Sequence, residues 1–270
     1  MYAGITLRRG SGRIIGVHQR IDRAARRHLN KHIPKSIDFP KITNILYFEG
    51  KNGPDAIKRK SPSQDEPWHF IDPTEPNDRA LLQMINDHII NLAKALRDSN
   101  DVRAAFESAW LAHAVVDGLT PPHHYPLDKK IEELWGKPHY ERMTTKDKNI
   151  IKGINRLDTI SKNWKYWRVG GIFMGHIMFE MGVISAIDIS KFKKSGPKNN
   201  DINRLNNEGF ETLFVESLNK IHNMKMYDEF SKNGWTMNLA IKTKKVLIPE
   251  IIKVVTLAWC QSVFMATEPL

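Results

Sequence analysis

The sequence predicts an all-α protein, on three observations. Apolar residues recur three and four positions apart in several long segments, which is the spacing of a helix with one buried face. No segment shows the alternation of apolar and polar residues that is typical of strands. Of the 270 residues, 41% are hydrophobic, enough to bury a sizeable core. We therefore expect one helical domain over residues 1–270.

The N-terminal part predicts two helices and a long loop. Residues 14–29 form the first helix, because their apolar side chains repeat at the helical spacing. A proline-punctuated segment follows, and the apolar run 42–48 then predicts a helical turn or a short helix. Residues 50–76 contain two Gly, five Pro and many charges, a composition that predicts a loop.

Four further segments of the middle region are assigned from their patterns. Residues 78–96 have one apolar face, and a second helix begins after a good capping sequence at 99–101 and ends by Gly118. Residues 146–160 are a weaker helical segment. Residues 172–184 are apolar on almost every side, which predicts a fully buried helix.

The C-terminal region predicts a scaffold of two long helices. Residues 191–201 are polar and contain Gly-Pro, so we expect a loop there. Residues 202–230 and 237–267 are the two expected helices. We expect the whole region 200–270 to pack on the rest of the domain.

Two stretches, 169–187 and 246–267, are apolar enough to raise the question of a membrane span. Each contains ionisable residues, which are costly at the centre of a bilayer, so we expect buried core helices and no transmembrane segment. Arg and His dominate residues 1–29, where no export signal is recognisable. The expected location is therefore cytoplasmic.

The composition indicates anionic partners. The formal net charge is +11 and the pI is about 9.6, which favours nucleic acid, an anionic membrane surface or phosphorylated substrates. A Lys-rich surface that keeps the protein in solution explains the charge equally well. The single cysteine, Cys260, excludes an internal disulfide and lies in an apolar stretch typical of a buried, inert thiol.

The helix that ends at Gly118 carries two candidate metal ligands. His113 and Asp117 lie four residues apart, so both can point to one metal ion from one face of the helix. After the helix, His123 and His124 follow two prolines in a short, stiff loop. Either histidine can supply a third ligand.

The same four-residue spacing recurs at His176 and Glu180, on the helix predicted to be buried. An unpaired carboxylate there would be strongly unfavourable, and a metal ion would neutralise it. A mutual hydrogen bond between the two side chains is the alternative. In the long loop, Asp55 and His69 are further candidates, although each taken alone is typical of a turn or a surface.

The order and spacing of these residues resemble the zinc-dependent phospholipases C and their relatives, the zinc-dependent single-strand nucleases. That family has an early His, a loop Asp and a loop His, then a His-x3-Asp-x5-His unit, and finally a His-x3-Glu or His-x3-Asp pair. The same places are filled here, in order, by His18, Asp55, His69, His113, Asp117, His123, His176 and Glu180. The resemblance covers about residues 14–185, and the unit from His113 to His123 is its most specific part.

The resemblance implies a cluster of two or three zinc ions. One ion would be held by a set of four ligands: Asp55, His69, His113 and Asp117. A second would be held by His123, His176 and Glu180. The third would be held by His18, by Asp117 and by an N-terminal Trp of the family. The first Trp of this sequence is Trp68, so the sequence departs from the family at that ligand.

The implied function is hydrolysis of phosphodiester bonds by metal-activated hydroxide, as in a phospholipase C. Asp55 would orient the attacking water or accept its proton. Lys58 could steady the substrate phosphate, although a solvated basic loop explains it as well. A phospholipid head group and a single-stranded nucleic acid both fit, and Glu180, where the nucleases tend to have Asp, favours the phospholipid.

Two alternatives are retained. One is a single-strand nuclease of the same fold. The other is a protein without catalysis, in which zinc staples the helices together and the basic surface binds membrane or nucleic acid.

Overall fold

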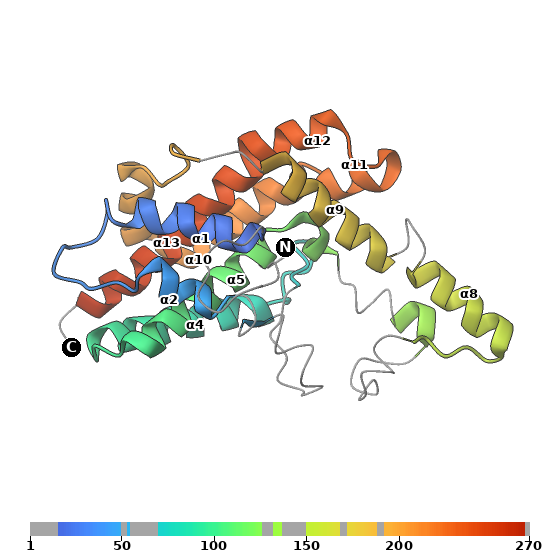
Figure 1. Cartoon of the computed structure of the whole chain (residues 1–270), viewed down its shortest axis with the longest axis horizontal. Helices are drawn as coiled ribbons and strands as arrows, with labels where there is room; N and C mark the ends of the chain where they lie inside the picture. Colours follow the sequence, from blue (N-terminus) through green and yellow to red (C-terminus); the bar gives the residue numbers. More distant parts are fainter. Residues whose placement is uncertain are drawn as a thin grey trace.

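The structure, a computed structural model, describes residues 16–49, 53–54, 70–125, 132–136, 150–167, 172–187 and 192–267. Within these ranges the chain forms helices and no strand, which confirms the all-α prediction. Figure 1 shows most helices packed side by side in one body, with α8 and a short helical segment, 132–135, at the far end.

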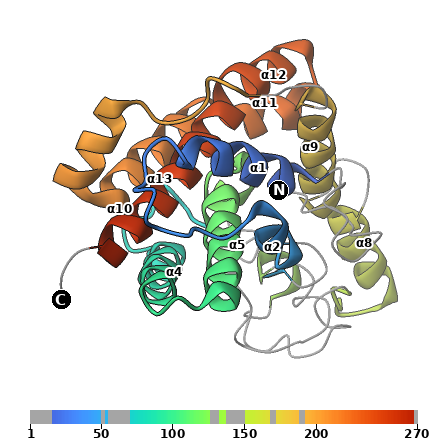
Figure 2. The same cartoon turned by 60° about the vertical axis from the view of Figure 1, so that its left-hand side comes forward.

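The central element is α13 (Ile248–Thr267). Four helices pack against it: α1 (Val17–Leu29), α4 (Ala80–Arg97), α5 (Asp101–Gly118) and α10 (Asn199–Asn223). Figure 2 shows α1, α5 and α10 gathered around α13 from a second direction. The helices that carry the N-terminal motifs are therefore fixed to a C-terminal scaffold.

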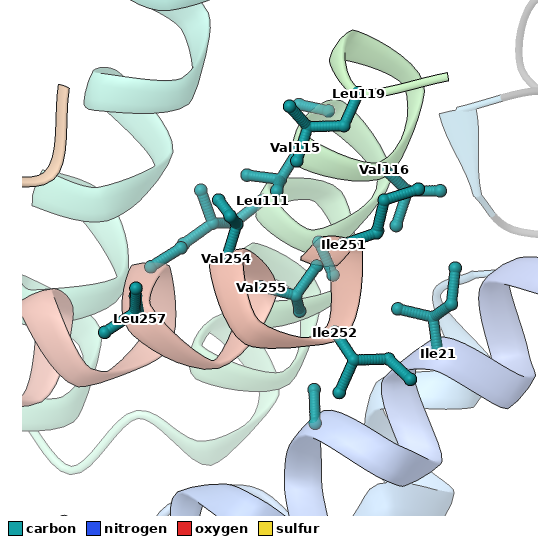
Figure 3. Close-up of a cluster of buried hydrophobic side chains, with 14 of the residues drawn as sticks. Ile21, Leu111, Val115, Val116, Leu119, Ile251, Ile252, Val254, Val255 and Leu257 are labelled. Carbon is teal, nitrogen blue, oxygen red and sulfur yellow. The ribbon is translucent and has the colours of Figure 1, made fainter. Parts of the chain in front are cut away.

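The middle of the core lies where α13 meets α5 and α1. Figure 3 shows Ile251 and Ile252 of α13 among side chains of α5, such as Val116, and close to Ile21 of α1. All four side chains are fully buried. Because α1 and α5 share this apolar contact, their polar residues are held in a fixed relation.

The segment Met237–Thr267 is long and apolar enough to cross a membrane, but 78% of its most apolar window is buried inside the protein. This is the behaviour expected of a core helix. Cys260 is fully buried in it, and burial raises the pKa of its thiol to about 12. The predicted burial of this thiol is confirmed, and a raised pKa disfavours the reactive thiolate.

One continuous helix was predicted over 237–267, and this was wrong because the segment is divided. The structure has α12 (Met237–Lys242), a π-helical turn (Thr243–Leu247) and then α13. Pro249 lies just inside α13 and has no backbone N–H to complete the preceding turn. The wider turn before it accommodates the missing hydrogen bond.

The single helix predicted over 202–230 is also divided. The structure has α10 followed by α11 (Met226–Asn233). Lys225, between them, adopts the left-handed conformation with φ of 50°, and Met226 is buried directly after it. A change of direction at one residue leaves no trace in the spacing of apolar residues.

The weak helix predicted over 146–160 is shifted towards the C-terminus, and residues 146–149 lie outside the described residues. The structure places α8 at Arg156–Trp167, and 150–155 is not helical. The side-chain oxygen of Asn155 accepts a hydrogen bond of 2.9 Å from the backbone N–H of Asp158, as an N-cap residue does. This local cap starts the helix later than the apolar pattern predicts.

The helix predicted to be buried on every side is α9 (Ile172–Ile187), and this expectation was wrong. Phe179 and Val183 are fully buried, but Met178 and Met181 on the other side are 46% and 51% exposed. The helix lies at the margin of the body, beside α8 (Figures 1 and 2). Apolar composition alone did not reveal that one side lacks a packing partner.

The remaining predicted helices are confirmed: α1, the short α2 (Ile42–Tyr47), α4 and α5. Asn100 caps α5 by accepting a hydrogen bond of 3.0 Å from the backbone N–H of Arg103. A short 3-10 turn, Pro121–His124, follows α5 directly.

Candidate metal centre

The structure describes six of the eight residues that the spacing singled out. His18 lies on α1, His113 and Asp117 on α5, His123 in the 3-10 turn, and His176 and Glu180 on α9. Asp55 and His69 lie outside the described residues, as does Lys58.

The first group joins α1 to α5. His18, His113 and Asp117 offer ligand atoms that all lie within 4.8 Å of one another, and all three side chains are buried. Oδ1 of Asp117 is 3.2 Å from Nε2 of His18, and Oδ2 is 3.3 Å from Nε2 of His113. The two imidazole rings stack with centroids 4.2 Å apart. Tertiary packing has thus added an α1 histidine to the local pair on α5.

The second group joins the 3-10 turn to α9. His123, His176 and Glu180 also offer ligand atoms within 4.8 Å of one another. Oε1 of Glu180 is 2.9 Å from Nε2 of His176 and 3.5 Å from Nε2 of His123. The hydrogen bond between His176 and Glu180, the alternative to a metal site, is therefore present. His123, a third side chain that can bind a metal ion, lies next to it.

Asp117 connects the two groups. Its Oδ2 is 3.8 Å from Nδ1 of His123, so one carboxylate contacts a histidine of each group. A carboxylate in this position could supply an oxygen ligand to a metal ion held by either group.

His123 and His124 face different surroundings. His124 donates from Nε2 to the backbone carbonyl of Gly118 at 3.0 Å and belongs to neither group. Burial lowers the pKa of His123 to about 4, although Asp117 acts in the opposite direction. His123 is therefore neutral near pH 7, which is the form that binds metal ions.

A seventh residue, Glu49, was missed by the sequence analysis. It follows α2, is fully buried, and its Oε1 lies 3.1 Å from Nδ1 of His18 and 2.9 Å from Nδ1 of His113. Only glycine fits at position 53, because a Cβ on Gly53 would overlap the backbone carbonyl of Glu49. The only feature of the sequence that could have pointed to Glu49 is its position, as an acidic residue directly after an apolar run.

Glu49 orients both histidines. Nδ1–H of His113 can donate to Oε1 of Glu49 at 2.9 Å, and Nδ1 of His18 lies 3.1 Å from the same oxygen. Nε2 of each ring faces Asp117. An outer carboxylate that orients a histidine in this way is common around zinc. The Nε2 atoms of His18 and His113 and the oxygens of Asp117 are therefore arranged as metal ligands require.

A second buried acid stands beside Glu49. Asp22 lies one helical turn after His18, is fully buried, and has no hydrogen bond to either carboxylate oxygen among the described residues. Burial and the charge of Glu49 raise the pKa of Asp22 well above its ordinary value. Three buried carboxyl groups, those of Asp22, Glu49 and Asp117, lie together here, and burying carboxylates without cations is unfavourable. These side chains therefore fit bound metal ions.

Zinc binding is expected to release a proton from His113. Burial by itself lowers the pKa of His113, but the carboxylates of Glu49 and Asp117 more than offset this and hold it well above its ordinary value. The metal-free side chain is therefore protonated at pH 7, and a metal bound at Nε2 must displace that proton. Titration calorimetry in two buffers of different ionisation enthalpy should show a net release of protons on zinc binding, and affinity should fall as the pH is lowered. Equal heats in both buffers would contradict this.

Glu49→Gln is expected to weaken zinc binding about 10- to 100-fold, because the amide keeps the size of the side chain but loses the charge that orients both histidines. Competition with a chelator of known affinity measures the change. The matched control is Glu250→Gln, a buried glutamate that contacts Ser217 and Lys220 and no residue of either group. Unchanged zinc affinity in Glu49→Gln would rule out the orienting role.

Solved structures share the fold of this chain. The alpha-toxin of Clostridium perfringens from the avian strain SWCP matches with a TM-score of 0.58 and 15% identity, over 91% of this chain and 62% of the toxin chain. The alpha toxin from Clostridium absonum matches with a TM-score of 0.57 and 14% identity, over 93% of this chain and 64% of the toxin chain. This chain thus spans less than two thirds of either toxin chain. At these identities the similarity is one of fold. No protein-family model matches the chain, and no curated protein matches its sequence.

Proposed function

We propose that this protein is a zinc-dependent phosphoesterase that hydrolyses the phosphodiester bond of phospholipid head groups. The observation that carries the proposal is the meeting of two groups of buried ligand-type side chains at Asp117. Two further facts support it: the ordered spacing of these residues resembles that of the zinc-dependent phospholipases C, and the fold is similar to that of two alpha-toxins.

The side chains of the centre have distinct tasks in this proposal. Bound zinc ions supply a Lewis acid for the phosphate and a water whose proton is lost near neutral pH. Asp117 holds the two groups together. Glu49 keeps Nε2 of His18 and His113 free for ligation. Glu180, 2.9 Å from His176, orients that imidazole and offers an oxygen of its own.

Three residues enter by the resemblance alone. Asp55 and His69 complete the ligands of the first group, and Asp55 orients the attacking water or accepts its proton. Lys58 steadies the substrate phosphate. The substitution Asp55→Asn should then lower turnover while the second group keeps its zinc. Full turnover after this substitution would count against the role given to Asp55.

A different function is favoured by one observation, the burial of the first group. His18, His113 and Asp117 are at most 2% exposed. A closed site of this kind is typical of zinc that holds a fold together rather than zinc that receives a substrate. In that case the protein would bind zinc and catalyse nothing.

One set of measurements separates these functions. Zinc per chain is counted by mass spectrometry in the purified protein and in the double variant His113→Ala, Asp117→Ala. Release of phosphorylated head group from phosphatidylcholine is assayed beside digestion of single-stranded DNA. Two or three zinc ions and head-group release, both lost in the variant, are expected. Zinc without hydrolysis indicates the structural role, cleavage of DNA alone indicates the nuclease, and no bound zinc after reconstitution contradicts a metal centre.

A further inference from the structure

The helix α8 exposes a stripe of large apolar side chains. Leu157, Ile160 and Trp164 are 80%, 64% and 67% exposed, and their spacing of three and four places them on one side of the helix. Ile154, just before the helix, is 96% exposed. We call Leu157, Ile160 and Trp164 the α8 stripe. Scattered exposed apolar residues are ordinary, but a continuous stripe with a tryptophan marks an interaction surface.

The segment before α8 does not cover the stripe, because it packs against a different side of the helix. The side-chain amide of Asn163 donates to the backbone carbonyl of Ile151 at 2.7 Å, and its oxygen accepts from the N–H of Ile151 at 3.1 Å. The hydroxyl of Thr159 accepts from the N–H of Gly153 at 2.9 Å. These contacts hold α8 by its polar side and leave the apolar stripe facing elsewhere.

Basic side chains flank the stripe. Arg156 lies beside it on one edge and Lys165 on the other, and both are exposed. Lys162 lies on the opposite side of the helix, where its ammonium is 3.2 Å from the carboxylate of Asp158, the one acidic residue of α8. A helix with Trp and Leu on one side and Lys and Arg beside them is typical of segments that lie in the surface of an anionic bilayer. The long basic side chains can reach head groups while the apolar ones enter the acyl region.

The flanking charge also argues against a second copy of this chain as the occupant. Two α8 stripes placed face to face would bring the basic flanks together, and the whole chain already carries a net charge of +11. Repulsion between like charges opposes such a dimer. An anionic lipid surface can instead bury the apolar stripe in its acyl region and bind the basic side chains beside it through its head groups.

The position of α8 relates it to the candidate metal centre. Among the described helices α8 packs chiefly against α9, which carries His176 and Glu180. Both helices lie at the same end of the molecule (Figures 1 and 2). Met178 and Met181 of α9 add exposed apolar surface at this end.

We propose that α8 docks the protein on an anionic phospholipid surface, with the α8 stripe among the acyl chains and Arg156 and Lys165 at the head groups. This docking rests on the proposed function for its biological meaning, because it names the membrane surface from which the enzyme would take its substrate. The docking itself requires neither zinc nor turnover.

The test measures binding of the purified protein, with its bound metal, to vesicles by co-sedimentation, over times too short for much release of head groups. Vesicles of phosphatidylcholine alone are compared with vesicles of phosphatidylcholine and phosphatidylglycerol. The wild type should bind the anionic vesicles more tightly, with a blue shift of tryptophan fluorescence. The triple variant Leu157→Ala, Ile160→Ala, Trp164→Ala should bind them at least about 100-fold more weakly, since three inserted side chains are lost. Arg156→Gln, Lys165→Gln should lose the preference for anionic vesicles.

The matched control is Val102→Ala, Met237→Ala, which removes two side chains of similar exposure that lie outside α8. Its vesicle binding should equal that of the wild type. Equal binding by the triple variant, or no binding by the wild type, would overturn the proposal. A wild-type dimer in sedimentation analysis that the triple variant dissociates, without vesicle binding, would assign the stripe to a second copy instead.

Failure of the docking and failure of the proposed function can be told apart with a water-soluble phosphodiester. The zinc-loaded triple variant should hydrolyse this substrate as the wild type does and lose activity only on vesicles. Vesicle binding without hydrolysis of either substrate would reject the enzyme and retain the docking.

Discussion

Asp117→Asn is expected to remove at least one zinc ion per chain and to lower phosphodiester hydrolysis by at least about 100-fold. Asp117 is the one described carboxylate that contacts both groups: its oxygens lie 3.2 Å from His18, 3.3 Å from His113 and 3.8 Å from His123. The amide has almost the same shape but no charge and one oxygen fewer. Its effect therefore exceeds the loss expected from the outer residue Glu49.

Zinc counted by mass spectrometry and head-group release measured on the same preparation check this expectation. The matched control is Asp87→Asn, the same change at an exposed position on α4, which should alter neither quantity. An Asp117→Asn protein that retains all its zinc would show that the two groups do not depend on a shared carboxylate.

Trp259→Ala is expected to lower the free energy of unfolding by about 3–5 kcal/mol. Trp259 is fully buried on α13, its ring centroid lies 5.6 Å from that of Phe39, and its indole N–H donates to the backbone carbonyl of Ser108 on α5 at 3.0 Å. The substitution leaves a large cavity between α13 and α5 and an unsatisfied carbonyl. Because a domain is stable by only about 5–15 kcal/mol, the loss is a large fraction of the total.

Urea denaturation followed by circular dichroism measures this change. Trp259→Phe separates the two contributions, because it keeps most of the ring and removes the hydrogen bond. We expect it to cost about 1–2 kcal/mol. A loss below about 1 kcal/mol for Trp259→Ala would mean that α13 is not the centre of the core.

The helical class and most helix positions could be predicted, because burial of one face imposes a periodicity that is visible in the chain. Where the observed helices differ from the predicted ones, the cause is a single residue whose effect does not appear in the spacing of apolar residues. Lys225 turns the chain between α10 and α11, Pro249 requires a wider turn before α13, and Asn155 delays the start of α8. The exposed side of α9 depends on what packs next to it.

The pairs His113 with Asp117 and His176 with Glu180 could be predicted for a local reason: four residues make about one helical turn, so the ligand atoms come together within a single helix. His18 was placed beside Asp117, at a third ion, only through the resemblance to a known family, and the structure brings it to His113 as well. The choice of His123 over His124 was likewise a matter of spacing, and the structure places only His123 in a group.

Local patterns are enough to predict that this protein is helical and that each of two helices carries a His and an acid on one face, because both follow from the geometry of a single helix. The position of Asp117 between both groups, the contacts of Glu49 with His18 and His113, and the outward direction of the α8 stripe could not be predicted in this way. These contacts join residues far apart in the chain. They exist because apolar packing against α13 fixes α1 and α5, and packing distances leave no periodic trace in a sequence.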